Sequence, residues 1–181
     1  MKLVVAGVGN ILRSDDGFGV VVAWRLLDHK LPEGVRVVET GIGGMALVQE
    51  LQDGADALIV VDAVDRGKPA GTVMVIRPEV PDIDSLTDIE RYDMLADVHL
   101  GTPERVLAMA KALGVLPSDV LMVGCQPADA ETFARGLSEP VARAVEVAVE
   151  QILLRVEELC DKPPGRDHTT AGGAKRVGSF A

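Results

Sequence analysis

The stretch that decides the fold is residues 57–76, which read ALIVVDAVDRGKPAGTVMVI. Residues 57–64 are almost uniformly apolar, which is typical of a strand that is buried on both faces of a sheet. A second apolar run, Thr72–Ile76, follows after the short connection Asp65–Gly71. A crossover between parallel strands needs about a dozen residues or more, so adjacent strands joined this way must run antiparallel. The stretch therefore predicts a mixed sheet with one reversed strand.

Apolar runs elsewhere predict three further strands, and periodic runs predict helices between them. The strands are Leu3–Val8, Val35–Glu39 and Val120–Val123. The helices are Gly17–Asp28, Met45–Leu51, one that begins at the cap Thr102-Pro103-Glu104, and a long one that Ser138 is expected to cap. The reversed strand, Thr72–Ile76, is then the fourth of five in an α/β domain.

The length of 181 residues suits one domain around one main core. Residues 1–160 contain all the predicted strands and helices and form that domain. Residues 161–181 are polar, rich in glycine and aperiodic, so we expect a disordered C-terminal tail. The connection Pro78–Asp97 is long and acidic, and long loops in compact domains are usually functional or mobile.

The composition excludes several classes of protein. Hydrophobic residues make up 48% of the chain and aromatic residues only 3%, so Val, Leu, Ile and Ala must fill the core. A net charge of -10 disfavours both nucleic acid and anionic membranes as partners. Cys125 and Cys160 are too few for a disulfide framework or a cysteine zinc site. The first residues predict a strand rather than a signal peptide, and no apolar run is long enough to span a bilayer. We therefore expect a cytoplasmic protein that binds neither nucleic acid nor membranes.

Polar residues at the carboxyl ends of the predicted strands mark the candidate site, since open α/β sheets bind ligands outside those ends. They are Gly9, Asn10, Asp15 and Asp16 after the first strand, Glu39 and Thr40 after the second, Asp62 near the end of the third, and His99 before a helix. One interpretation is a nucleotide site, because Gly7-x-Gly9 is part of the dinucleotide fingerprint. Leu12 occupies the third glycine position, however, and Asp15-Asp16 would place two negative charges beside the phosphates, which disfavours this interpretation.

Taken singly, Asp16, Asp62 and His99 each have an ordinary structural explanation. They resemble an acid at a helix N-terminus, a strand-end carboxylate that caps a loop, and a surface histidine. Burying Asp62 among apolar neighbours nevertheless costs free energy unless a partner satisfies it. Two carboxylates and an imidazole from three strand-to-helix regions can meet at one edge of the sheet, and such a set suits nickel or zinc. No His-Glu-x-x-His helix or nucleophilic cysteine motif occurs, so the residues alone indicate a metal-binding α/β domain.

The stretch GVGNILRSDDGFG, residues 7–19, closely resembles the opening signature of the [NiFe]-hydrogenase maturation peptidases. Thr40–Met45, Ile59–Ala63 and His99 at the start of a helix resemble later motifs of that family in order and spacing. The similarity covers about residues 1–158. It implies a three-layer α/β/α fold, with one mixed five-stranded sheet between helices and an antiparallel fourth strand.

The resemblance also implies an endopeptidase that removes the C-terminal extension of a [NiFe]-hydrogenase large-subunit precursor after nickel insertion. Asp16, Asp62 and His99 match the three metal-binding positions of the family and are implied to be metal ligands and catalytic residues. Many members carry Glu at the first position, where this chain has the shorter Asp16. The implied metal is the nickel that the substrate carries, no organic cofactor is implied, and the implied partner is the precursor.

Three protein ligands leave coordination positions open for an ion that the substrate carries. Hydrolysis then requires no nucleophilic side chain, because a metal can polarise the scissile carbonyl or lower the pKa of a water, and both routes stay open. The alternative functions are a non-cleaving metal-binding module and a nucleotide-binding module of the same α/β class.

Overall fold

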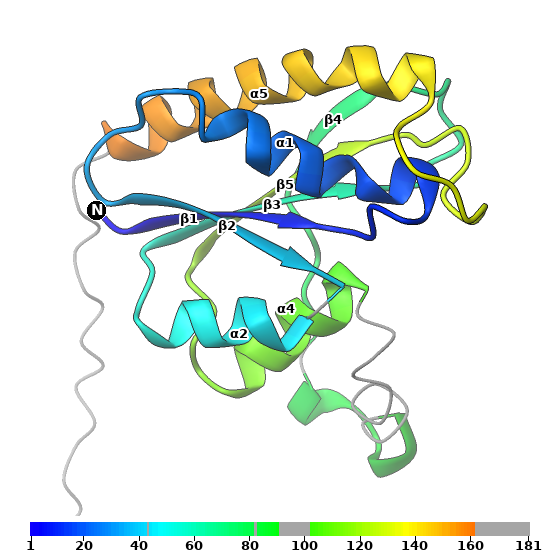
Figure 1. Ribbon diagram of the computed structural model, residues 1–181. Helices are drawn as coiled ribbons and strands as arrows, with labels where there is room; N and C mark the ends of the chain where they lie inside the picture. The colour runs from blue at the N-terminus through cyan, green and yellow to red at the C-terminus, as the bar shows by residue number, and fades with distance from the viewer. Residues whose placement is uncertain (43, 82, 91–101, 162–181) are drawn as a thin grey trace, which may run out of the picture.

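A five-stranded sheet forms the middle layer of the molecule, with its strands in the order β2-β1-β3-β5-β4 (Figure 1). The computed structural model describes residues 1–42, 44–81, 83–90 and 102–161. The strands are β1 (Leu3–Val8), β2 (Val35–Gly41), β3 (Ala57–Ala63), β4 (Val73–Ile76) and β5 (Asp119–Cys125). The helices are α1 (Phe18–Leu26), α2 (Gly44–Gln52), α4 (Pro103–Ala112) and α5 (Glu139–Cys160), with short 3₁₀ helices η1 (Ser14–Gly17) and η2 (Ile83–Ser85).

The sheet is mixed, and the reversed strand is β4. β1 pairs in parallel with β2 and β3, β3 pairs in parallel with β5, and β4 pairs antiparallel with β5. The predicted three-layer α/β/α fold with an antiparallel fourth strand is therefore confirmed. The prediction that β3 and β4 are adjacent is wrong, because β5 lies between them. Neighbouring strands are only about 5 Å apart, so a short connection can also step over one strand along the same edge.

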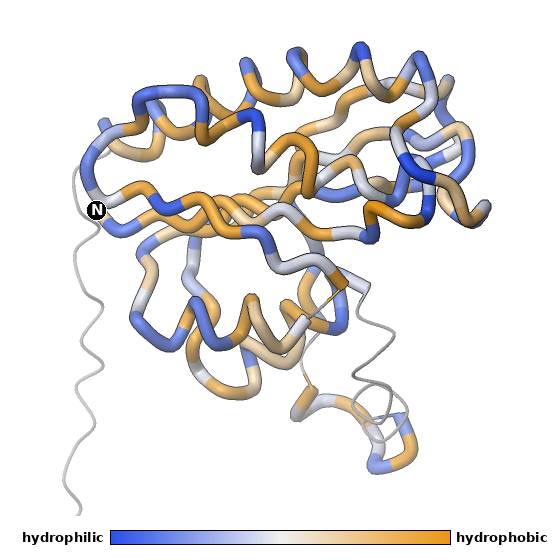
Figure 2. The backbone as a smooth tube through the Cα atoms, in the orientation of Figure 1, coloured by the Kyte–Doolittle hydropathy of each residue, from blue (hydrophilic) through white to orange (hydrophobic). Residues whose placement is uncertain are grey.

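Helices cover both faces of the sheet, with α1 and α5 on one face and α2 and α4 on the other (Figure 1). β3 supplies both halves of the core, because its successive side chains point to opposite faces. Ile59 and Val61 pack in the cluster with α1 and α5, whereas Leu58 and Val60 pack in the cluster with α2 and α4. In Figure 2 the sheet is mainly hydrophobic, and α5 turns its hydrophilic residues away from it. A strand buried on both faces is what the apolar run at 57–64 predicted.

Several elements differ in extent from the predictions. β2 continues to Gly41 and β5 runs from Asp119 to Cys125, because the pairing with their neighbours extends past the apolar runs. α1 ends at Leu26 rather than at Asp28. Ser138 does precede α5, but its hydroxyl does not cap the helix.

The long acidic connection contains η2, in which Ile83 is buried. Its later part, residues 91–97, lies outside the described residues, as does the predicted tail beyond Asp161. The division into a domain of residues 1–160 and a disordered tail of residues 161–181 therefore stays a prediction.

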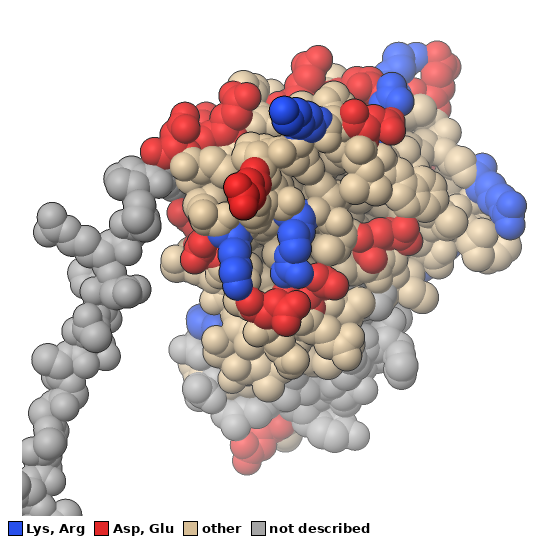
Figure 3. Space-filling model, turned by 60° about the vertical axis from the view of Figure 1, so that its left-hand side comes forward, with Lys and Arg blue, Asp and Glu red and all other residues tan. Residues whose placement is uncertain are grey.

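The surface carries charges of both signs. Figure 3 shows acidic side chains along the edge formed by α5, with basic side chains among them. In the parts of the chain that the structure describes, no helix has the length and apolar composition required to span a bilayer. The cytoplasmic location and the absence of nucleic-acid and membrane partners stay predictions.

The start of α1 packs against the sheet more closely than any side chain would allow. A Cβ atom at Gly19 would stand 2.1 Å from the carbonyl oxygen of Val61 and 2.4 Å from that of Val8. A Cβ atom at Gly7 would stand 2.3 Å from the carbonyl oxygen of Gly19. Because these neighbours are backbone atoms in a close-packed interior, they cannot move aside as a flexible side chain would. The glycines therefore set the distance between α1 and the ends of β1 and β3.

We predict that Gly19→Ala destabilises the protein by about 3 kcal/mol, although alanine normally favours a helix over glycine by about 1 kcal/mol. Gly54→Ala is the matched control, since a Cβ there meets nothing within 4 Å and only the positive φ of +79° opposes it. That change should cost only about 1 kcal/mol. Urea unfolding measures both values, and a Gly19→Ala variant as stable as the parent would contradict the packing.

Candidate functional site

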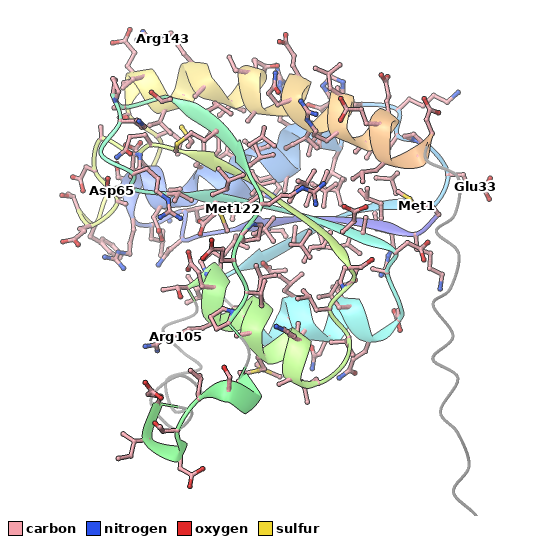
Figure 4. The ribbon with its side chains drawn as sticks, turned by 180° about the vertical axis from the view of Figure 1, so that it is seen from behind. Met1, Glu33, Asp65, Arg105, Met122 and Arg143 are labelled. Atoms are coloured by element: carbon pink, nitrogen blue, oxygen red, sulfur yellow. The ribbon has the colours of Figure 1, made fainter. Side chains whose placement is uncertain are left out.

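A pocket of about 460 Å³ opens at the carboxyl ends of β1 and β3, and we call it the carboxylate pocket. Its charged lining residues are Arg13, Asp16, Asp62, Asp65, Arg66 and Glu104. Figure 4 shows Asp65 at this end of the sheet and Met1 and Glu33 at the opposite end. Since four of the six charged lining residues are acids, the pocket favours a ligand that carries positive charge.

Asp62 lies near the end of β3, with 7% of its surface exposed. Its Oδ1 atom accepts a hydrogen bond of 2.8 Å from the N–H of Ala63. Burial raises the pKa of Asp62 well above its ordinary value of 3.8; the bond from Ala63 opposes this shift, and the charges of Asp16 and Glu104 add to it. One backbone hydrogen bond does not compensate a carboxylate for the loss of water. Asp62 therefore keeps its proton more readily than a surface aspartate does.

Asp16 belongs to η1 and is partly buried. Its Oδ2 atom accepts a 3.0 Å hydrogen bond from the N–H of Asn10, and its own N–H donates to the carbonyl oxygen of Arg13 at 3.0 Å. Burial raises the pKa of Asp16, while the Asn10 bond and the positive charge of Arg13 lower it. These hydrogen bonds within the loop from Asn10 to Asp16 fix the direction of the Asp16 carboxylate.

Close packing at Gly9 holds the backbone of Asp16 near the end of β3, where Asp62 lies. Gly9 has a φ of +131°, and a Cβ there would stand 1.8 Å from the carbonyl oxygen of Asp16 and 3.7 Å from Oδ1 of Asp62. A side chain at this position would push η1 away from β3. Both carboxylates line the same pocket as a result. The glycine that suggested a nucleotide fingerprint is therefore accounted for by contacts within the chain.

The third predicted residue of the set, His99, lies outside the described residues. The next described residues along the chain, Thr102, Pro103 and Glu104, all line the carboxylate pocket. Within the described ranges, no group of three or more His, Cys, Asp or Glu side chains is placed to hold a metal ion. The roles of Asp16, Asp62 and His99 as metal ligands and catalytic residues therefore stay predictions.

The other polar residues singled out from the sequence have structural partners away from the pocket. Glu39 accepts a 2.8 Å hydrogen bond from the indole N–H of Trp24. The buried hydroxyl of Thr40 donates to the carbonyl oxygen of Gly7 at 3.3 Å. These contacts hold β2 against α1 and β1 and leave both side chains out of the pocket lining.

Asp15, the neighbour of Asp16, is a fully buried anchor rather than a pocket residue. Its carboxylate accepts four hydrogen bonds of 2.6–3.1 Å, from the N–H groups of Ala128, Asp129 and Ser138 and from the Ser138 hydroxyl. These bonds tie the loop after β1 to the loop before α5. The predicted site includes Asp16 and not Asp15, although both acids follow the first strand. Successive residues of a 3₁₀ helix point about 120° apart, so only one of the two acids faces the pocket, but no signal in the sequence tells which one.

The sequence-based prediction also lacked Gln126 and four charged lining residues, Arg13, Asp65, Arg66 and Glu104. Gln126 is a buried polar residue directly after β5. The rule that selected Asp62, a polar residue at the carboxyl end of a buried strand, would have found it as well. The charged residues are exposed, and nothing in the sequence distinguishes them from ordinary surface residues.

The family model for hydrogenase maturation proteases matches residues 20–155. Among relatives of known role, the hydrogenase expression/formation protein HupM of Azotobacter chroococcum mcd 1 is 38% identical over 149 residues, covering 82% of this chain and 68% of its own length. The hydrogenase expression/formation protein HoxM of Azotobacter vinelandii is 36% identical over 177 residues, covering 97% of this chain and 80% of its own length.

Solved structures agree with the sequence matches. The hydrogenase maturating endopeptidase HybD from E. coli superposes with a TM-score of 0.71 at 30% identity, covering 88% of this chain and 94% of that one. The hydrogenase 2 maturation peptidase from Thaumarchaeota archaeon SCGC_AB-539-E09 superposes with a TM-score of 0.61 at 32% identity, covering 86% of this chain and 98% of that one.

We predict that Asp15→Ala lowers the free energy of unfolding by about 3 kcal/mol, because three partly buried hydrogen bonds between two loops are lost together with the fully buried carboxylate that accepts them. Ser138→Ala removes only the hydroxyl bond and should cost about 1 kcal/mol. Chemical unfolding of both variants provides the comparison. If Asp15→Ala cost no more than Ser138→Ala, the anchoring role would be wrong.

Asp62 should make stability depend on pH. Because its pKa is raised above 3.8 in the folded state, folding retains a proton that the unfolded chain releases. The contribution of Asp62 to the free energy of unfolding is therefore fully present below the pKa that this group has in the unfolded chain. It is lost as the pH rises through the raised pKa of the folded state.

We predict that Asp62→Asn removes this dependence, since an amide oxygen can still accept the bond from Ala63. In buffer containing a chelator, the variant should be more stable than the parent by about 1 kcal/mol at pH 7, and the difference should disappear toward pH 4. Unfolding curves measured across this range test the prediction, with the exposed Asp28→Asn as control. A variant less stable than the parent at pH 7 would refute it.

Proposed function

Because the chain belongs to the hydrogenase maturation protease family, we propose that it is an endopeptidase that acts on a hydrogenase large-subunit precursor. In this proposal it removes the C-terminal extension of a [NiFe]-hydrogenase precursor after nickel has been inserted. The observation that carries the proposal is the carboxylate pocket, in which Asp16 and Asp62 lie together at the carboxyl ends of β1 and β3. Ligands of open α/β sheets bind at this edge.

In the proposed reaction, Asp16, Asp62 and His99 recognise the nickel ion that the precursor carries. Carboxylate oxygens and an imidazole nitrogen are suitable ligands for a divalent first-row metal. The position of Thr102–Glu104 in the pocket lining supports the inclusion of His99, which precedes them by a few residues. Three protein ligands leave coordination positions for the groups by which the precursor holds its own metal. An extension on a precursor without nickel would then lack the feature that the pocket binds.

The raised pKa of Asp62 fits a site that binds its metal only together with the substrate. A carboxyl group must release its proton before it can bind a metal, so metal binding and proton release are coupled. Burial and the charges of Asp16 and Glu104 favour the protonated form of Asp62 in the free pocket. An incoming divalent ion reverses that balance, because it is the largest local charge. A carboxyl group with a raised pKa is also suited to moving a proton during hydrolysis.

The peptide bond is hydrolysed without a nucleophilic side chain in this proposal. Cys125 is unsuited to attack, because it is buried and burial raises the pKa of its thiol to about 11. A thiol with that pKa holds almost no thiolate at neutral pH. The metal of the substrate can instead polarise the scissile carbonyl or lower the pKa of a water molecule.

We predict that Asp16→Asn, Asp62→Asn and His99→Ala each slow the trimming of nickel-loaded precursor by at least about 100-fold. The mass of the large subunit before and after incubation is the measurement. Asp28→Asn and His29→Ala, which change the same residue types at exposed positions, should leave the rate unchanged. Precursor prepared without nickel should not be trimmed by the parent protein.

Two results would count against the proposal. Normal trimming by a folded Asp62→Asn/His99→Ala double variant would remove the assigned residues from the reaction. A parent protein that binds nickel-loaded precursor but never shortens it would instead support the alternative of a non-cleaving metal-binding module.

A further inference from the structure

The connection from β3 to β4, residues 64–72, forms one wall of the carboxylate pocket, and we call it the β3–β4 loop. It passes across the carboxyl end of β5, which lies between the two strands that it joins. The N–H of Val64 donates to the carbonyl oxygen of Cys125 at 2.8 Å, and the N–H of Gly71 donates to that of Gln126 at 2.9 Å. Between these fixed ends, Asp65 and Arg66 line the pocket.

Gln126 holds the middle of this loop with its side-chain amide, which is buried at 5% exposure. Its Oε1 atom accepts hydrogen bonds from the N–H groups of Arg66 at 2.7 Å and Lys68 at 3.1 Å. Its Nε2 atom donates to Oδ1 of Asp65 at 2.9 Å. Two backbone donors on one side and a carboxylate on the other fix which end of the amide is the oxygen. The position of Arg66 is thus set by a residue at the end of another strand.

This arrangement leaves the guanidinium group of Arg66 available to a ligand. The adjacent acid, Asp65, already accepts hydrogen bonds from Gln126 and from the N–H of Gly67 at 2.9 Å. Arg66 is exposed at the pocket, and it forms no ion pair with any residue of the described ranges. Its charge is therefore not neutralised by a described side chain within ion-pair distance.

An arginine of the pocket lining that has no ion-pair partner in the described ranges can bind an anionic partner. The pocket is proposed to receive a metal ion, which its four acids attract and which Arg66, a cation without an ion-pair partner in the described ranges, repels. A carboxylate of the substrate would cancel the repulsion. Carboxylates also match the planar fork of an arginine, to which they bind through two parallel hydrogen bonds.

We propose that Arg66 binds a carboxylate group of the precursor at the carboxylate pocket, and that Gln126 is a positioning residue that holds Arg66 in place through the β3–β4 loop. The inference rests on the proposed function and names a further feature of the same substrate. The carboxylate comes from an acidic side chain near the scissile bond or from the terminal carboxylate of the extension.

The test is a kinetic comparison of the parent with Arg66→Ala, Gln126→Ala and the double variant, using nickel-loaded precursor. Arg66→Ala should raise KM about tenfold with kcat unchanged, because it removes a contact that binds the substrate and the transition state equally. Gln126→Ala should raise KM by a smaller factor, and the double variant should be no worse than Arg66→Ala alone. Arg66→Lys, which keeps the charge, should recover part of the loss. Lys68→Ala is the matched control, since it removes a cation from the same loop outside the pocket lining.

Two modified precursors identify the source of the carboxylate. One carries amides in place of the acidic side chains around the cleavage site, and the other carries an amidated C-terminus. Arg66→Ala should have no effect on KM with the precursor that lacks the bound group. If Arg66→Ala raised KM equally with both modified precursors, or if it did not change KM with any precursor, the inference would be overturned. If the increases in KM of Gln126→Ala and Arg66→Ala combined fully in the double variant, Gln126 would not act through Arg66, and its positioning role would be wrong.

The same variants separate this inference from the proposed function. If the parent protein does not cleave the precursor, the proposed function fails, and the equilibrium affinity of the parent and of Arg66→Ala for that precursor still tests the carboxylate contact. Equal affinities in that measurement would overturn the inference.

Discussion

The candidate site depends on a steric constraint, namely that the chain after β1 can turn back onto the sheet only where side chains are missing. Gly9 and Gly19 allow η1 and α1 to lie in direct backbone contact with the ends of β1 and β3. That contact places Asp16 beside Asp62, although the two residues belong to different strand-to-helix connections. The glycine-rich opening of the chain is therefore a packing requirement that determines where two carboxylates meet.

Buried polar groups keep this arrangement rigid. Asp15 anchors the loop after β1 to the start of α5, and Gln126 anchors the β3–β4 loop to the end of β5. Each is itself buried and satisfies its own hydrogen-bonding capacity largely with backbone N–H groups of a neighbouring loop. Asp62, by contrast, is buried with a single hydrogen bond in the described structure, from Ala63. Rigid surroundings and one poorly compensated acid are typical of a functional site, where stability is lost in return for chemistry.

Local patterns in the sequence predicted much of the fold, but not every neighbour. The apolar run at 57–64 indicated a strand buried on both faces, and the short connection after it gave the direction of β4. It could not give the position of β5, because a strand formed later in the chain can be inserted without changing that connection. The preference of ligands for the carboxyl ends of parallel strands selected Asp16 and Asp62, which line the pocket, but also Asp15, Glu39 and Thr40, which do not. It could not distinguish Asp16 from Asp15, since their opposite roles depend on a contact with residues more than 100 positions away.

The closeness of Asp16 and Asp62 can be measured without substrate, metal or activity. Titration of the Asp62 carboxyl carbon by NMR, in the parent and in Asp16→Asn, tests it most directly. We expect that the pKa of Asp62 is raised in the parent, falls when the charge of Asp16 is removed and does not respond to Asp28→Asn. If Asp62 titrated at its ordinary pKa, or if its pKa did not change in Asp16→Asn, the two carboxylates would not lie close together at this edge of the sheet.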